Sequence, residues 1–179
     1  MNQISPIKKT AVTAVCTALC VVLPIALHSV ANAGRVLLPM HLPVLVCGLV
    51  CGGAPGLLCG LLGPVLSALI TGMPDMAHLP GMIVELAVYG LIAGLLMRWV
   101  RTGKPLADCY ISLVGAMLAG RIAAGLVKAL IFSAGKYSFA AWIAAHFVTG
   151  LPGIILQLVL IPLIYLALQK SRLIPKRYP

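Results

Sequence analysis

The sequence predicts an all-α membrane protein, a bundle of six transmembrane helices with both termini in the cytoplasm. Of its 179 residues, 61% are hydrophobic and only 9% are charged, whereas soluble domains carry about 25% charged residues. The apolar residues fall in runs of about 20, which is the length that crosses a bilayer. Cations cluster outside these runs, as they do at the cytoplasmic ends of membrane helices.

Six apolar segments define the predicted spans, and no repeat or linker interrupts the single integral-membrane domain 1–179. Their approximate bounds are 10–29, 36–52, 55–72, 81–100, 107–132 and 140–169. Gly/Pro-rich or polar breaks separate them, as turn residues do between helices. The first span follows Lys8 and Lys9 like a signal peptide, but no cleavage site followed by a soluble domain is present. We therefore interpret it as a membrane helix.

The positive charges define the topology. Nine of the 13 cations flank the spans on one side: Lys8, Lys9, Arg98, Arg101, Lys104, Lys170, Arg172, Lys176 and Arg177. The positive-inside rule places these nine in the cytoplasm. A nucleic-acid function is not indicated by the net charge of +10, because such binding needs the cations on one basic face.

Composition also argues against catalysis. Asp and Glu together number only three, so carboxylate-based hydrolysis and acidic metal cages have almost no residues to use. The six cysteines are not grouped with His and Asp at metal-ligand spacings and are interpreted as small packing residues rather than metal ligands. No zinc-protease motif, nucleophile elbow or phosphate-binding loop is present. We expect no enzyme activity, no cofactor and no metal.

A few polar side chains lie inside the apolar runs, where charge is expensive and marks functional candidates. Glu85 lies about one turn into the fourth span, and Tyr89 follows one turn later on the same side. Arg121 lies in the outer half of the fifth span, and Lys128 follows seven residues later. These four residues predict a polar ligand pocket in the outer half of the membrane. Equally, Glu85 and Arg121 would pair to hold two helices in register while Lys128 reaches the headgroups.

Two further regions contribute candidates. Asn32, Met40 and His41 lie around the first outer loop and the start of the second span, and His146 and Gln157 lie in the sixth. A single His in a membrane span more often bonds another helix than a ligand. These five residues complete the predicted ligand-binding set.

Small residues mark a face of the first span. Ala14 and Ala18 are four residues apart, a spacing that lets another helix backbone approach closely. The same pattern would also serve helix packing within the bundle. The two interpretations are therefore internal packing and, more specifically, contact with a helix of a partner protein.

Several stretches resemble the substrate-binding S component of energy-coupling factor (ECF) type vitamin transporters. Residues 37–45 read LLPMHLPVL and continue through Cys47-Gly48 to Gly60; the other stretches are LITGMP at 69–74, ELAVYGL at 85–91 and LAGR at 118–121. Together they extend over most of the chain. The length, the six predicted spans and the cytoplasmic ends agree with that family.

The resemblance implies a function that composition does not show. S components bind a water-soluble vitamin at an outward-facing pocket and associate with a transmembrane coupling subunit and two ATPase subunits. The family's alanine motif, matched here by Ala14 and Ala18, docks the coupling subunit. The resemblance implies ATP-driven import across a prokaryotic plasma membrane, with hydrolysis performed by the partners.

The ligand is predicted from the charge balance. Arg121 and Lys128 outnumber Glu85, which suits a ligand with a carboxylate and hydroxyls, so pantothenate is the first expectation and pyridoxine or a related heterocycle the second. The alternative function is a solitary secondary transporter or channel that uses Glu85 and Arg121 as a gate. A scaffold or membrane enzyme is a third class, but a scaffold would not need buried charges.

Overall fold

The computed structural model describes residues 4–27, 36–129, 143–144, 148–175 and 178. All its regular elements are helical in this part of the chain, as the sequence predicts. The six helices are α1 (Pro6–Ala26), α3 (His41–Cys51), α4 (Gly53–Thr71), α5 (Leu79–Trp99), α6 (Pro105–Val127) and α8 (Leu151–Lys170). Five of them are long and apolar enough to cross a membrane.

The exception is α3, which has 11 residues and is therefore about 16 Å long, roughly half the hydrocarbon thickness of a bilayer. We predicted a helix over 36–52, but α3 begins at His41 because the chain turns first. Leu38 has a positive φ of 51°, which a right-handed helix does not accommodate. Gly52 has a φ of 105° and separates α3 from α4. The count of six spans therefore stays a prediction.

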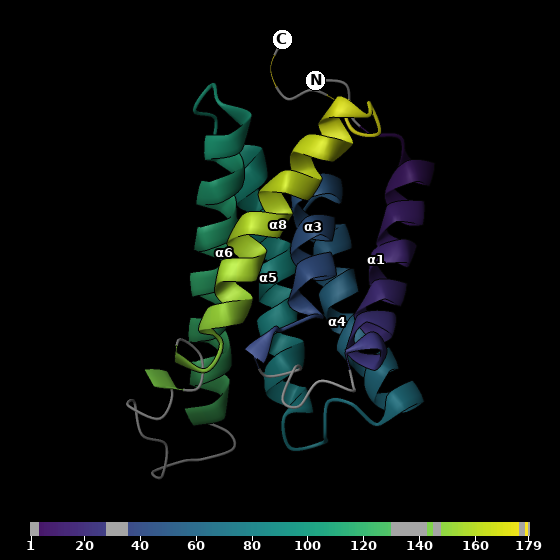
Figure 1. The fold of residues 1–179 in the computed structure, drawn as a ribbon, viewed down its shortest axis with the longest axis vertical. Helices are drawn as coiled ribbons and strands as arrows, with labels where there is room; N and C mark the ends of the chain where they lie inside the picture. Colours follow the sequence, from purple (N-terminus) through teal and green to yellow (C-terminus); the bar gives the residue numbers. More distant parts are fainter. Residues whose placement is uncertain (1–3, 28–35, 130–142, 145–147, 176–177, 179) are drawn as a thin grey trace.

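Figure 1 shows the helices side by side, with α8 crossing obliquely in front. The first turn of α1 and the last turn of α8 lie at the same end of the bundle as the α5–α6 connection. We call this the terminal end. The cytoplasmic location predicted for it is not tested by the structure. Helix α5 is central and packs on α3, α4 and α6, while α8 packs on α3 and α6.

Glycines allow α3, α4 and α5 to pack almost backbone to backbone. A Cβ on Gly90 of α5 would collide with the carbonyl of Gly56 in α4, and one on Gly48 of α3 would collide with the carbonyl of Gly90. Close approach of this kind is typical of small residues in membrane bundles. It fixes the height of α5, and therefore of the polar residues that α5 carries.

Helix α1 lies against α3 and α4 and has two different faces. Cys16, Thr17 and Cys20 are buried, whereas Ala14 and Ala18 are exposed on the outer side. All six cysteines are free and buried. The alanine pattern of the first helix is thus not used for packing within the described bundle.

Candidate functional site

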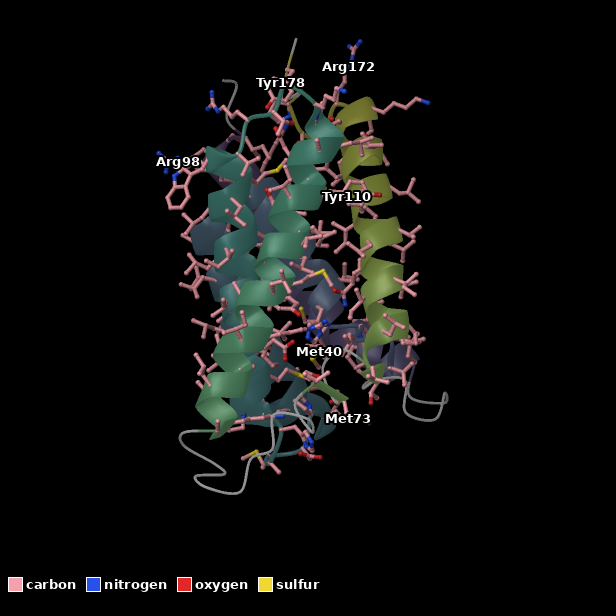
Figure 2. All side chains as sticks on the ribbon, turned by 90° about the vertical axis from the view of Figure 1, so that its left-hand side faces the viewer. Met40, Met73, Arg98, Tyr110, Arg172 and Tyr178 are labelled. Carbon is pink, nitrogen blue, oxygen red and sulfur yellow. The ribbon has the colours of Figure 1, made fainter. Side chains whose placement is uncertain are left out.

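Four of the predicted site residues come together where α3 begins. His41 starts α3, Glu85 and Tyr89 project from α5, and Arg121 projects from α6. We call these four residues the polar cluster. Figure 2 shows Met40, the residue before His41, inside the bundle between Tyr178 at the terminal end and Met73 at the opposite end.

Glu85 lies between Arg121 and His41. Its Oε1 lies 3.8 Å from Nε of Arg121 and 3.6 Å from Nε2 of His41. The side chains of His41 and Arg121 are almost fully buried, at 2% and 3% exposed, and that of Glu85 is 12% exposed. An interior charge is stable only when it is paired. Glu85 and Arg121 therefore neutralise each other, and the pair joins α5 to α6.

Tyr89 is held by two neighbours. Its ring meets the His41 ring edge to face, with the centroids 5.3 Å apart and the planes at 72°, a favoured geometry for aromatic pairs. On the other side the ring lies over Gly120 of α6, where a Cβ would collide with it. Gly120 thus makes the space that Tyr89 occupies, immediately before Arg121 in the sequence.

Several neutral polar atoms at this level have no hydrogen-bond partner among the described residues. They are both ring nitrogens of His41, the hydroxyl of Tyr89, and both the nitrogen and the oxygen of the Gln157 amide. Tyr89 and Gln157 are fully buried. A buried polar group without a partner costs about 1–3 kcal/mol. Native proteins keep few such groups, and a concentration of them needs a reason.

Gln157 lies close to the height of the cluster on α8. One turn before it, Gly153 packs against the backbone of Val36 and Leu37, where a Cβ would come within 2.7 Å of the Val36 carbonyl oxygen. Residues four apart share a helix face. Gln157 therefore lies on the face of α8 that meets the chain just before α3, about one turn further along the bundle.

The remaining predicted residues are placed differently. Met40 is buried, and its carbonyl accepts a bond from Sγ of Cys20 at 3.6 Å. The stem of Lys128 packs over Gly81 at the start of α5, where a Cβ would lie 2.9 Å from Lys128 Cε. Gly81 is one turn before Glu85, so Lys128 lies at the margin of the cluster. Asn32 and His146 fall outside the described residues.

One buried carboxylate was missed by the sequence analysis. Asp108, fully buried near the start of α6, accepts bonds from the Thr102 amide at 2.8 Å, the Thr102 hydroxyl at 2.7 Å and the Tyr178 hydroxyl at 2.6 Å. An Asp three residues after Pro105, at the start of a helix, is the signal that identifies it. Within the described ranges, no three His, Cys, Asp or Glu side chains are grouped to hold a metal ion.

No curated protein and no solved structure matches this chain. The family model described as "ECF transporter, substrate-specific component" matches residues 8–165, which confirms the resemblance found in the sequence and includes every helix that contributes to the polar cluster. The chain therefore belongs to the family of substrate-specific components of ECF transporters, and is a multi-pass membrane protein that binds substrate for a transporter.

Proposed function

We propose that this chain captures a small water-soluble vitamin, pantothenate or pyridoxine in the first instance, at the polar cluster and Gln157. The family implies a substrate and an ECF module with a transmembrane subunit and ATPase subunits. In this proposal His41, Glu85, Tyr89, Arg121 and Gln157 contact the ligand, and Met40 and Lys128 border it. Asn32 and His146 remain predicted contacts.

The observation that carries the proposal is the set of buried polar groups that have no hydrogen-bond partner among the described residues. If the cluster served only to hold α5 and α6 in register, the Glu85–Arg121 pair would be sufficient. This role would not explain why the Gln157 amide, the Tyr89 hydroxyl and the His41 ring make no short hydrogen bond among the described residues. A ligand that bonds these groups removes their desolvation cost, and this gain becomes binding free energy.

The partner surface is proposed to be the outer face of α1. Ala14 and Ala18 are exposed there beside exposed Val15 and Leu19. A small-residue ridge between larger apolar side chains accepts another membrane helix. The coupling subunit would supply that helix, and ATPase subunits bound to it would hydrolyse ATP.

Capture is tested on the purified chain in mild detergent. Ligand that co-purifies is released by denaturation and identified by mass spectrometry, and calorimetry against a vitamin panel then measures affinity. A single ligand bound with nanomolar affinity is expected. A folded chain that binds nothing in the panel and carries no ligand contradicts the proposal, and proton- or ion-coupled uptake by the chain alone would favour the solitary carrier.

Docking is tested separately from capture. Ala14→Leu with Ala18→Leu adds bulk to the outer face of α1, so we expect transport to be lost while the isolated chain keeps its affinity. The control is Ala167→Leu, which adds the bulk of one of these two substitutions at an exposed position of α8 and should leave transport intact. Transport that survives the double change would show that α1 is not the docking face.

A further inference from the structure

We propose that the substrate is electrically neutral and carries both hydrogen-bond donors and acceptors, which favours a pyridoxine-like ligand over a carboxylate such as pantothenate. This inference rests on the proposed function, because it concerns the same site. It reverses the order expected from counting charges in the sequence. The reversal follows from how the structure pairs those charges.

The ionic groups of the cluster are already balanced. Arg121 supplies one positive charge and Glu85 one negative charge, and Nε of Arg121 lies 3.8 Å from an oxygen of Glu85. Arg121 is therefore not a spare cation that waits for a carboxylate. A ligand carboxylate would bring a second anion beside Glu85, and an uncompensated charge in a buried site is strongly unfavourable. A cationic ligand would compete with Arg121 for the same carboxylate.

Lys128 does not add a positive charge next to Tyr89 and His41. Its stem packs over Gly81, one helical turn from Glu85, and the residue is partly exposed. A carboxylate bound at Lys128 would lie toward the end of the bundle. The hydroxyl of Tyr89 and the nitrogens of His41 would then still have no hydrogen-bond partner among the described residues.

Three buried side chains that lack hydrogen-bond partners among the described residues, those of Gln157, Tyr89 and His41, are uncharged, and each can both donate and accept hydrogen bonds. The Gln157 amide offers donors and an acceptor, the Tyr89 hydroxyl offers one of each, and a neutral imidazole offers one of each. All are buried and lack partners among the described residues. Groups of this kind are satisfied by hydroxyl, amide or ring-nitrogen atoms. They discriminate strongly against analogues that lack those atoms, because the site's own groups are then left unpaired.

The test uses pairs of ligands that share a skeleton and differ in one charge. The isolated chain is titrated by calorimetry with pyridoxine against 4-pyridoxate, pantothenol against pantothenate, and nicotinamide against nicotinate. In each pair that binds, we expect the neutral member to bind at least about tenfold more tightly. Tighter binding of the carboxylate member overturns the inference while leaving the capture function intact.

Co-purified ligand decides the case where no pair binds. A neutral compound released from the denatured protein supports the inference, and a charged one overturns it. A folded chain that binds no probe and releases no ligand contradicts the proposed function itself, so the two failures are distinguishable.

A variant tests the cause. Glu85→Gln removes the anion and leaves the positive charge of Arg121 uncompensated, so the carboxylate member of a binding pair should gain at least about tenfold relative to the neutral member. The matched control is Asp75→Asn, the same change at an exposed carboxylate paired with His78 in the α4–α5 connection, which should not alter the ratio. An unchanged ratio in Glu85→Gln would overturn the assignment of Glu85 as the group that excludes carboxylates.

Discussion

Asp108 and Glu85 are two buried carboxylates in very different surroundings. Asp108, near the terminal end, accepts three bonds of 2.6–2.8 Å from Thr102 and Tyr178. Glu85, deeper in the bundle, lies 3.8 Å from Arg121 and 3.6 Å from the His41 ring, near buried polar atoms that have no hydrogen-bond partner among the described residues. The Asp108 network is complete and ties the C-terminal segment to the α5–α6 connection. In the proposed function, the bound substrate completes the surroundings of Glu85.

This difference separates stability from function. When a saturated hydrogen-bond network is cut, the protein loses stability but no ligand affinity. An unsaturated one lowers the stability of the empty protein and gives affinity in return, as strained or destabilised functional sites commonly do. Each variant below is therefore assayed for both thermal unfolding and ligand affinity, the ligand being the one identified by the capture experiment.

The largest effect on affinity is expected from Arg121→Ala. It removes the cation opposite Glu85, so Kd should rise by at least about 100-fold, equivalent to about 2.7 kcal/mol, while the chain still folds. The unfolding midpoint should also fall, because Glu85 loses its partner. The double change Glu85→Gln with Arg121→Gln removes both charges and should restore the midpoint but not the affinity. Unchanged affinity in Arg121→Ala would assign the residue a purely structural role.

Gly120→Ala should have the next largest effect. The added methyl group would collide with the Tyr89 ring and approach the Glu85 carbonyl oxygen to 2.8 Å, so two members of the cluster must move. Overpacking of this kind costs about 1–3 kcal/mol, and we expect affinity to fall by about tenfold or more. The matched control is Gly115→Ala on the same helix, where the methyl group meets only the tip of the flexible Leu96 side chain.

The outcome that would contradict this role of Gly120 is specific. If Gly120→Ala lowers the unfolding midpoint no more than Gly115→Ala and leaves the affinity unchanged, the position of the Tyr89 ring is not important for binding.

Sequence reasoning identified the cluster because of the cost of charge in a membrane. Glu85 and Arg121 were singled out as ionisable residues within apolar runs, and Tyr89 by its spacing from Glu85. The structure places all three together with His41. Helix type was equally predictable, since each apolar run is too long for a strand.

Pairing and helix ends were not predictable in the same way. Lys128 follows Arg121 by two turns on nearly the same face, and only the packing of α6 on α5 shows that its stem covers Gly81. The run 36–52 contains Pro39 and Pro43, which favour a helix boundary near them, but it is the turn at Leu38 that places the start of α3 at His41. The place of Asp108 at the start of α6 was readable from the sequence, but its hydrogen bond with Tyr178, 70 residues away, was not.

Gln157→Leu should produce a smaller loss of affinity together with a gain in stability. Both amide atoms of Gln157 are buried without partners among the described residues, so an apolar side chain of similar size removes a desolvation cost of about 1–3 kcal/mol. We expect the unfolding midpoint to rise or stay constant, and Kd to increase by about tenfold.

Gln169→Leu is the matched control on the same helix. Gln169 is also buried, but its amide donates to the Tyr165 hydroxyl at 2.9 Å, so its replacement should lower stability by about 1 kcal/mol and leave affinity unchanged. If both glutamine variants lose stability alike, the Gln157 amide has a partner in the folded protein and is not held open for a ligand.

Asp108→Asn should leave ligand affinity unchanged and lower the stability of the protein. The neutral amide replaces a carboxylate that accepts three short bonds, and bonds to a charged group contribute about 1.5–3 kcal/mol each. Tyr178→Phe removes only one of the three bonds, so its unfolding midpoint should lie between those of the wild type and Asp108→Asn. A loss of ligand affinity in either variant would mean that the terminal end is coupled to the polar cluster through α6, because Asp108 and Arg121 lie 13 residues apart on that helix. The two carboxylate sites would then be parts of one system.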